Sequence, residues 1–179
     1  MLVKILIGIA LAVVLFVVVV ALQPSTFHVA RTGLVSAPPP VVFEQVNVLR
    51  NWESWNPWLK LDPAAKTTYE GPPEGKGAIS RWVGNGNVGE GSMTITESRP
   101  SDLVRFRLDF LKPFASTATA EFTFQPDGDK TLVTWSMDGA NSFLAKAFGL
   151  FMNMDKMIGG PFEDGLADMN AAVEANSKQ

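Results

Sequence analysis

The chain has 179 residues, 46% of them hydrophobic and 18% charged, which suits one compact domain with an extension and excludes a disordered chain. It has no cysteine and a single histidine, His28, which excludes disulfides, thiolate nucleophiles and metal sites rich in cysteine or histidine. Its 15 basic residues are outnumbered by 18 acidic ones, and they form no basic run. We therefore expect no metal, no cofactor and no nucleic acid partner.

Residues 2–22, LVKILIGIALAVVLFVVVVAL, carry one charge, on Lys4. At about 1.5 Å per residue a helix of this length spans roughly 31 Å, the thickness of a bilayer core. The apolar part of a cleaved signal peptide is usually only about 7–15 residues long. This segment therefore predicts a single-pass transmembrane anchor, with a signal peptide cleaved after Ala21 as the alternative.

Positive charge on either side of this span predicts its orientation. Lys4 and the α-amino group precede it, and the first basic residue after it is Arg31. This bias predicts a cytoplasmic N-terminus and an extracytoplasmic remainder. We divide that remainder into a linker at 23–26, a domain at 27–175 and a short tail at 176–179.

The domain begins with a predicted strand over 27–37, which the prolines at 38–40 end. Val42, Val46 and Leu49 then recur at helical spacing, which predicts a helix after the prolines. Next comes a segment rich in tryptophan, NWESWNPWLKLDP, over residues 51–63.

Six further strands are predicted next, because apolar residues now recur at every second position. Their expected ranges are 66–70, 77–83, 90–98, 102–111, 115–125 and 130–138. The alternation is clearest in LVRFRLDF and TATAEFTF, and the segment PDGD after the second is a strong hairpin turn. One apolar and one polar face indicate an antiparallel sheet that is covered on one side.

The cover is a C-terminal helix that starts near Ser142. Gly159, Gly160 and Pro161 predict a kink or break in it. Beyond the break, Phe162, Leu166, Met169 and Val173 resume the helical spacing. The whole order predicts an α+β domain in which a curved antiparallel sheet of about seven strands wraps one long C-terminal helix.

This order resembles the START-like helix-grip superfamily, also called SRPBCC, in its polyketide cyclase/dehydrase and lipid-transport branch with an N-terminal membrane anchor. The stretches that carry the resemblance are WESWNPWLKLDP (52–63), VGEGSMTI (88–95) and FMNMDKMIGGPFEDGLADM (151–169). It covers about residues 27–175, and none of these stretches is a catalytic signature. It implies a cavity between sheet and helix that binds a lipid or another hydrophobic molecule.

The large side chains expected between sheet and helix are the candidate cavity residues. They are Trp55, Trp58, Trp82, Met93, Phe106, Phe122, Trp135, Phe148, Phe151 and Met152. A densely packed core would use the same residue types, so the pattern leaves a filled core and a lined pocket both open. Arg81 lies on a strand with apolar residues at both parities; turned inward, it would bind a carboxylate or phosphate head group.

Two other patterns have plainer explanations. Gly84, Gly86 and Gly89 match a dinucleotide-binding fingerprint, but an alternating strand follows them where that fingerprint needs a helix. Asn85-Gly86 instead favours a hairpin turn. His28 has no nearby acidic or nucleophilic partner in the sequence, so we expect a surface histidine.

Trp52, Trp55 and Trp58 allow three interpretations: a cage for a cation, a belt at the membrane interface, or a packing wedge that closes one end of the cavity. We favour the wedge, because Pro57 disturbs the helical spacing and the span lies well upstream.

The leading functional hypothesis is a membrane-anchored, non-catalytic domain that binds a hydrophobic small molecule or lipid. One alternative is a structural or regulatory interaction domain with a filled core. The other is a cyclase or dehydrase, for which the sequence offers no convincing acid–base pair.

Overall fold

The structure is a computed structural model that describes residues 1–177, apart from the side chain of Met154. The last two residues of the expected tail lie outside this range. The helices are α1 (Leu2–Ala21), α2 (Pro39–Asn47), the short 3-10 helix η1 (Leu49–Ser54), α3 (Pro57–Leu61), α4 (Phe143–Gly149) and α5 (Met154–Asn176). The strands are β1 (Thr26–Val35), β2 (Lys66–Glu70), β3 (Ile79–Val83), β4 (Glu90–Arg99), β5 (Leu103–Lys112), β6 (Ser116–Asp127) and β7 (Lys130–Ala140).

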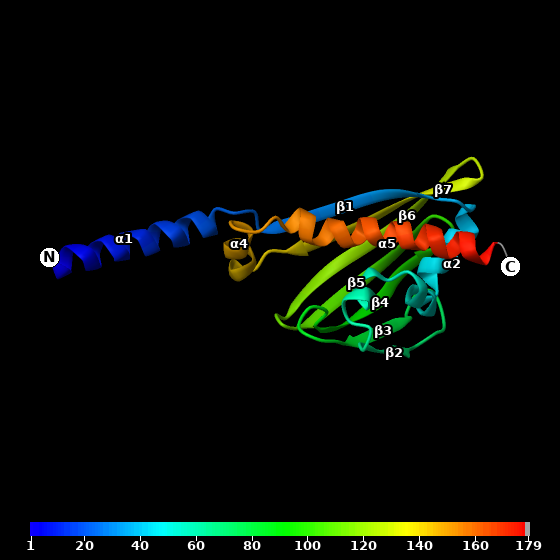
Figure 1. Ribbon diagram of the computed structural model, residues 1–179, viewed down its shortest axis with the longest axis horizontal. Coiled ribbons are helices and arrows are strands. Elements are labelled where there is room, and N and C mark those ends of the chain that lie inside the picture. Colours follow the sequence, from blue (N-terminus) through cyan, green and yellow to red (C-terminus); the bar gives the residue numbers. More distant parts are fainter. Residues whose placement is uncertain (178–179) are drawn as a thin grey trace.

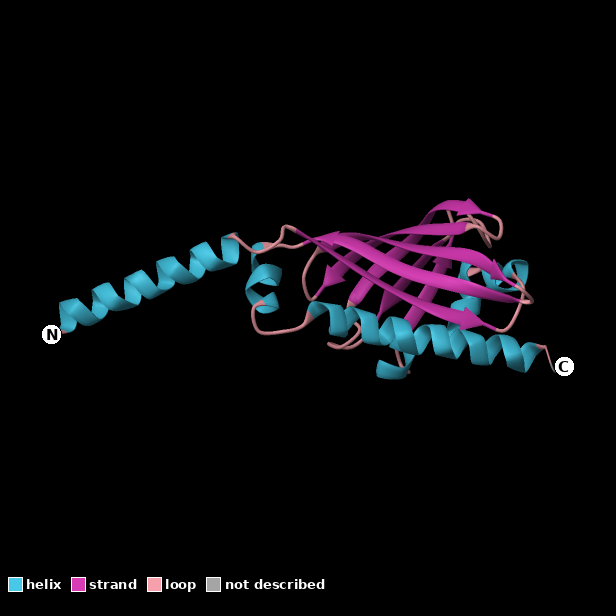
Figure 2. Ribbon diagram, turned by 90° about the horizontal axis from the view of Figure 1, so that it is seen from above, coloured by secondary structure: helices cyan, strands magenta, loops and turns pink. Residues whose placement is uncertain are grey.

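The seven strands form one antiparallel sheet in the order β1-β7-β6-β5-β4-β3-β2. The sheet curves around α5, which runs along its concave side (Figures 1 and 2). Register shifts between Glu90 and Gly91 and between Ile95 and Glu97 increase the local bend. The predicted α+β helix-grip fold is confirmed.

The alternation of β5 decides which side chains meet the helix. Val104, Phe106 and Leu108 are buried on the concave face. Arg105 points outward, where its Nε lies 2.8 Å from a carboxylate oxygen of Glu121 on β6. The two residues form an ion pair between neighbouring strands.

Helix α1 projects away from the domain, and most of its side chains are exposed (Figures 1 and 2). Val20, at its domain end, is an exception and is fully buried. In length and composition α1 is able to cross a membrane, and a signal sequence near the N-terminus meets the same criteria.

The C-terminal helical region breaks at residues 150–153 rather than at the predicted Gly159-Gly160-Pro161. Pro161 lies inside α5. Gly160 has no Cβ to clash with the Pro161 ring, which removes one of the usual causes of a break before proline. The new helix is instead capped at its start by Asn153, whose side chain accepts a hydrogen bond from the Lys156 N–H.

Candidate functional site

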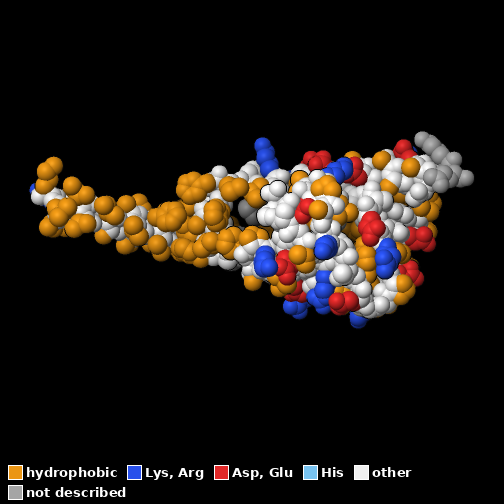
Figure 3. Space-filling model, turned by 60° about the horizontal axis from the view of Figure 1, so that its bottom comes forward, with side chains coloured by type: hydrophobic (Ala, Val, Ile, Leu, Met, Phe, Trp, Pro, Cys, Tyr) orange, Lys and Arg blue, Asp and Glu red, His pale blue; other side chains and the backbone are white. Residues whose placement is uncertain are grey.

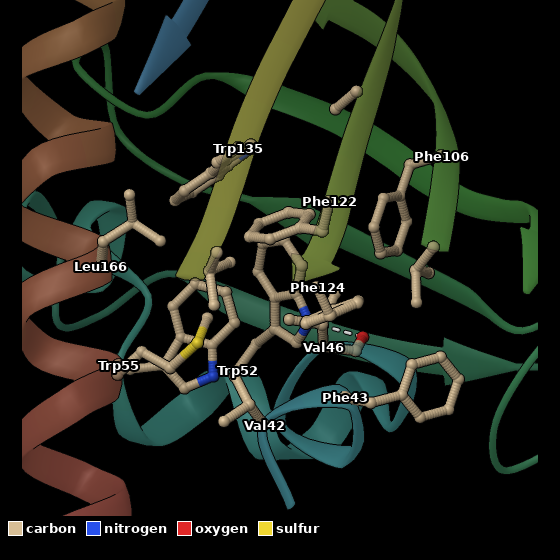
Figure 4. Close-up of a cluster of buried hydrophobic side chains, with 14 of the residues drawn as sticks. Val42, Phe43, Val46, Trp52, Trp55, Phe106, Phe122, Phe124, Trp135 and Leu166 are labelled. Carbon is tan, nitrogen blue, oxygen red and sulfur yellow. Dashed lines mark hydrogen bonds between the residues drawn. The ribbon is translucent and has the colours of Figure 1, made fainter. Parts of the chain in front are cut away.

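Part of the space between sheet and helix is filled by an aromatic core, which we define as Trp52, Trp55, Phe106, Phe122, Trp135 and Phe162. All six side chains are buried, and Figure 4 shows most of them facing one another. Trp135 stacks on Phe162 with ring centroids 4.0 Å apart and on Phe122 at 4.6 Å. Such contacts add to the free energy of ordinary burial.

Hydrogen bonds to carbonyl groups of α2 hold the tryptophan segment in this core. Trp52 Nε1 donates a hydrogen bond to the Val46 carbonyl at 3.0 Å, and Trp55 Nε1 donates to the Gln45 carbonyl at 3.2 Å. Trp58 is half-buried and packs edge-on against Trp135 at 5.6 Å. The rings therefore pack against one another as a wedge would, and they do not converge on an open space.

The concave face becomes more accessible toward the end of the sheet nearest α1. Ile95, Phe106 and Phe122 are fully buried, with 0% exposure. One row nearer to α1, paired residues run across five strands: Met93, Leu108, Ala118, Gly139 and Phe27. In this row Met93, Leu108 and Ala118 are 6–8% exposed and Phe27 is half-buried.

Glycines leave room for aromatic rings at this end of the concave face. A Cβ on Gly139 would lie 2.5 Å from the Phe27 ring, and one on Gly91 would lie 2.6 Å from the Trp82 ring. Each aromatic ring thus lies directly over a glycine, and Trp82 contacts Phe110 edge-on at 5.9 Å.

We call this region the anchor-side surface and define it as Phe27, Trp82, Met93, Leu108, Phe110 and Ala118. Its Phe27, Trp82 and Phe110 side chains are partly exposed and its Met93, Leu108 and Ala118 side chains are buried, whereas every side chain of the aromatic core is buried.

The candidate residues from the sequence fall into three places. Trp55, Phe106, Phe122 and Trp135 belong to the aromatic core, with Trp58 at its border. Trp82 and Met93 belong to the anchor-side surface.

Phe148, Phe151 and Met152 do not join them; they are exposed on α4 and the loop after it. The prediction placed them against the sheet because it continued one helix through residues 150–153. The actual break there turns α4 away from the concave face.

Arg81 is also away from the concave face. Because Ser80 is buried on β3, the alternation turns Arg81 outward, where its Nε lies 2.9 Å from Glu70 Oε1. This hydrogen bond holds the pKa of Glu70 below its usual range. Arg81 therefore cannot serve as the inward head-group contact considered from the sequence.

A charged residue, Arg31 of β1, lies on the concave face and pairs with Trp135 of β7. Its guanidinium binds Asp155 at 2.7 Å and Glu163 at 2.5 Å, both on α5. A Cβ on Gly159 would overlap the Arg31 guanidinium, so the glycine lets the guanidinium lie against the helix. Its hydrogen bond lowers the pKa of Asp155.

The partners of Arg31 lie more than 120 residues further along the chain. We call the contacts of Arg31 with Asp155 and Glu163 the Arg31 clamp. Sequence reasoning missed it, because no local pattern links β1 to those carboxylates.

His28 also has a distant partner. Its Nδ1 lies 2.7 Å from Asp138 Oδ1, and both side chains are more than half exposed. They border a hollow of about 560 Å³ whose lining follows consecutive residues of β1, β6 and β7 and takes none from the described part of α5. Its lining combines outward-facing residues with Phe27, Ala118 and Gly139 of the concave row, so the hollow lies at the ends of these three strands.

A smaller hollow of about 230 Å³ lies beside η1, β2 and β3. There the Arg50 guanidinium stacks over the Tyr69 ring at 4.5 Å, and the Tyr69 hydroxyl donates to Glu53 at 2.8 Å. Burial and this hydrogen bond raise the pKa of Tyr69. These contacts satisfy the polar groups around the hollow.

The glycine-rich segment is a hairpin, as expected. Gly84 N–H donates to the Gly89 carbonyl at 2.8 Å, and strand β4 follows. The helix that a dinucleotide site needs is not formed here.

A family model described as "Polyketide cyclase / dehydrase and lipid transport" matches residues 26–174. The chain belongs to this family. The match spans the sheet, the aromatic core, the anchor-side surface and nearly all of α5, and the family lies within the SRPBCC superfamily. The resemblance stated from the sequence is thereby confirmed.

Solved structures agree on the fold. Protein CV1439 from Chromobacterium violaceum has 14% identity and a TM-score of 0.59, covering 85% of this chain and 99% of its own. TTHA0849 from Thermus thermophilus has 20% identity and the same TM-score of 0.59, covering 84% and 99%. DynU16, from the dynemicin biosynthetic locus, has 18% identity and a TM-score of 0.57, covering 83% and 48%. A search of curated proteins found no match.

Proposed function

We propose that this protein is a membrane-anchored, non-catalytic domain that binds a lipid or another hydrophobic molecule on its anchor-side surface. The observation that carries the proposal is the rise in exposure along the concave face, from the closed aromatic core to the half-buried Phe27, Trp82 and Phe110. An apolar ligand placed there would remove apolar area from water without opening the core.

Two further observations support this function. The family description includes lipid transport, and α1 joins β1 through a four-residue connection at the same end as this surface (Figure 1). With α1 as a transmembrane anchor, N-terminus in the cytoplasm and domain outside it, the anchor-side surface lies close to a source of lipid.

The filled aromatic core favours a second candidate, an interaction domain that uses the fold as a rigid scaffold. Trp135 stacks between Phe122 and Phe162, so protein side chains alone fill the aromatic core. The two candidates differ in whether an apolar molecule occupies the anchor-side surface.

Photolabelling distinguishes them. The full chain is reconstituted in phosphatidylcholine vesicles with a palmitic acid that carries a photoreactive diazirine, irradiated and mapped by peptide mass spectrometry. We expect adducts on β4 and β5 around Met93, Leu108 and Phe110. Adducts on α1 report that the probe and the protein share the membrane.

Ala118→Trp and the milder Ala118→Leu fill the surface and should remove most of the β4 and β5 adducts. Thr119→Trp is the matched control, because the neighbouring side chain is exposed on the opposite face and should leave labelling unchanged. Circular dichroism checks that each variant folds. Labelling of α1 without labelling of β4 or β5 in the unmodified chain would overturn the binding proposal and favour the interaction domain.

A further inference from the structure

Large exposed apolar side chains are concentrated in one short segment of the domain. Outside α1 such residues are scattered along the described chain, except between residues 143 and 157. There Phe143, Leu144, Phe148, Phe151 and Met152 are all exposed, Phe151 at 81%. We call these five the α4 patch. Isolated apolar residues on a surface need no explanation, but a concentration of this kind indicates a contact surface.

The patch is continuous with the domain end of α1. Helix α4 packs against α1, Val20 is fully buried at this junction, and Lys146 Nζ approaches the Ala21 carbonyl at 3.5 Å. Asn141 fixes the same junction through hydrogen bonds to Ser25 and Pro24. Figures 1 and 2 show α4 beside the end of α1, and Figure 3 shows hydrophobic side chains continuing from α1 to this junction.

Charge in this segment also matches a membrane surface. Lys146 and Lys156 are its basic residues, while its one carboxylate, Asp155, is bound by Arg31. A short helix with Phe and Leu side chains and nearby lysines is the composition that lies in the interface between headgroups and acyl chains. Since α1 is only about 30 Å long, its domain end and α4 reach that interface together.

We propose that the α4 patch inserts into the outer interface of the membrane that α1 spans and seats the domain on the bilayer. The interface covers the apolar side chains, and the lysines contact anionic headgroups. The same end of the sheet carries the anchor-side surface, so the patch sets that surface against the lipid. This inference rests on the anchoring part of the proposed function.

The chain has no cysteine, so single reporters can be introduced cleanly. Phe151→Cys, Val14→Cys and Val41→Cys are each labelled with the fluorophore NBD in the full chain. Each is reconstituted in vesicles of phosphatidylcholine and phosphatidylglycerol, with and without a phosphatidylcholine that carries a nitroxide near its headgroup. Val14 lies in the middle of α1, and the exposed Val41 lies on α2 at the far end of the domain.

We expect a blue-shifted emission and strong nitroxide quenching at position 151, and neither at position 41. Quenching at 151 should weaken in vesicles of phosphatidylcholine alone. Introducing Leu144→Asp and Phe148→Asp beside the reporter should return its emission to that of position 41, because charged side chains are costly to bury in lipid.

The reporter at position 14 distinguishes a failure of the domain to sit on the membrane from a failure of α1 to enter it. A blue shift at 14 with a water-exposed signal at 151 overturns the seating of the domain and leaves the anchor intact. A water-exposed signal at 14 overturns the anchor itself. A blue shift at 151 without lipid quenching, together with disulfide-linked dimers of unlabelled Phe151→Cys, would show that a second copy of the chain covers the patch and would overturn the inference.

Discussion

The aromatic core and the anchor-side surface are both built from large apolar residues, but their side chains differ in burial. In the aromatic core, rings from β5, β6, β7, η1 and α5 pack edge-on or stack, and all of them are buried. At the anchor side, Gly91 and Gly139 replace side chains, and Phe27 and Trp82 lie over those glycines with part of their surface exposed. Packing stabilises the first region, while the second retains apolar surface that another molecule can cover.

The packed core and the proposed binding surface therefore lie side by side along one sheet. The helix that covers both regions is itself divided. Phe162, Leu166 and Met169 hold its C-terminal part in the core, whereas the Arg31 clamp holds its N-terminal part through ion pairs. The following predictions test whether the two regions are independent.

The largest effect is expected from Trp135→Ala in the aromatic core. The indole Nε1 makes no hydrogen bond within the described residues, so the loss comes from ring packing. Deleting a buried aromatic ring should lower the free energy of unfolding by about 3–5 kcal/mol. Denaturant unfolding of the full chain in detergent micelles, followed by far-ultraviolet circular dichroism, measures it.

The matched variant at the anchor side is Phe110→Ala. Because this ring is half-buried, its loss should cost only about 1–2 kcal/mol. Equal costs for the two variants would show that the two regions form one uniform core.

A smaller, local loss of stability is expected when acid protonates Asp155 in the Arg31 clamp. Hydrogen bonding to Arg31 lowers the pKa of Asp155 in the folded protein, so this contact stabilises the fold at pH values above the ordinary aspartate pKa of about 3.9. The contribution is lost as the pH falls through the lowered pKa of the folded state.

Hydrogen exchange, corrected for its intrinsic pH dependence, should show the N-terminal turns of α5 losing protection below about pH 4. The turns that contain Leu166 and Met169 should stay protected, since packing holds them. Asp155→Asn should reduce protection at neutral pH and flatten its pH dependence. Unchanged protection in that variant would contradict the role of the clamp.

The smallest effect is expected from Arg81→Gln. This side chain pairs with Glu70 on the exposed outer face, and such pairs contribute little to stability. Neither the unfolding midpoint nor palmitate photolabelling should change measurably. A loss of labelling would return Arg81 to the binding site and overturn the separation of the two sheet faces.

Much of the fold follows from periodicity. The alternation in LVRFRLDF and TATAEFTF predicted two central strands and their buried faces, because successive side chains on a strand point to opposite faces. The C-terminal stripe from Phe162 to Val173 was equally clear. The break at residues 150–153 was not, because Gly-Gly-Pro looks like a stronger helix breaker when the arginine beside it is unknown.

The candidate site was less predictable. The sequence pattern selects large apolar residues as a class, but a ring in a closed core and a ring on an accessible surface have the same pattern. Trp135 and Trp82 differ in how many neighbouring elements cover them. That number depends on where η1 and α5 lie.

Local spacing and runs of similar residues were enough to specify the apolar N-terminal helix, the seven-stranded antiparallel sheet, the covering helix and the family. Three other features became visible only in the folded domain: Arg31 clamps α5, Arg81 faces outward beside Glu70, and the phenylalanines of α4 leave the core. The clamp and the place of α4 depend on contacts between distant parts of the chain. Such contacts join residues that are far apart in the sequence, so local spacing carries no sign of them.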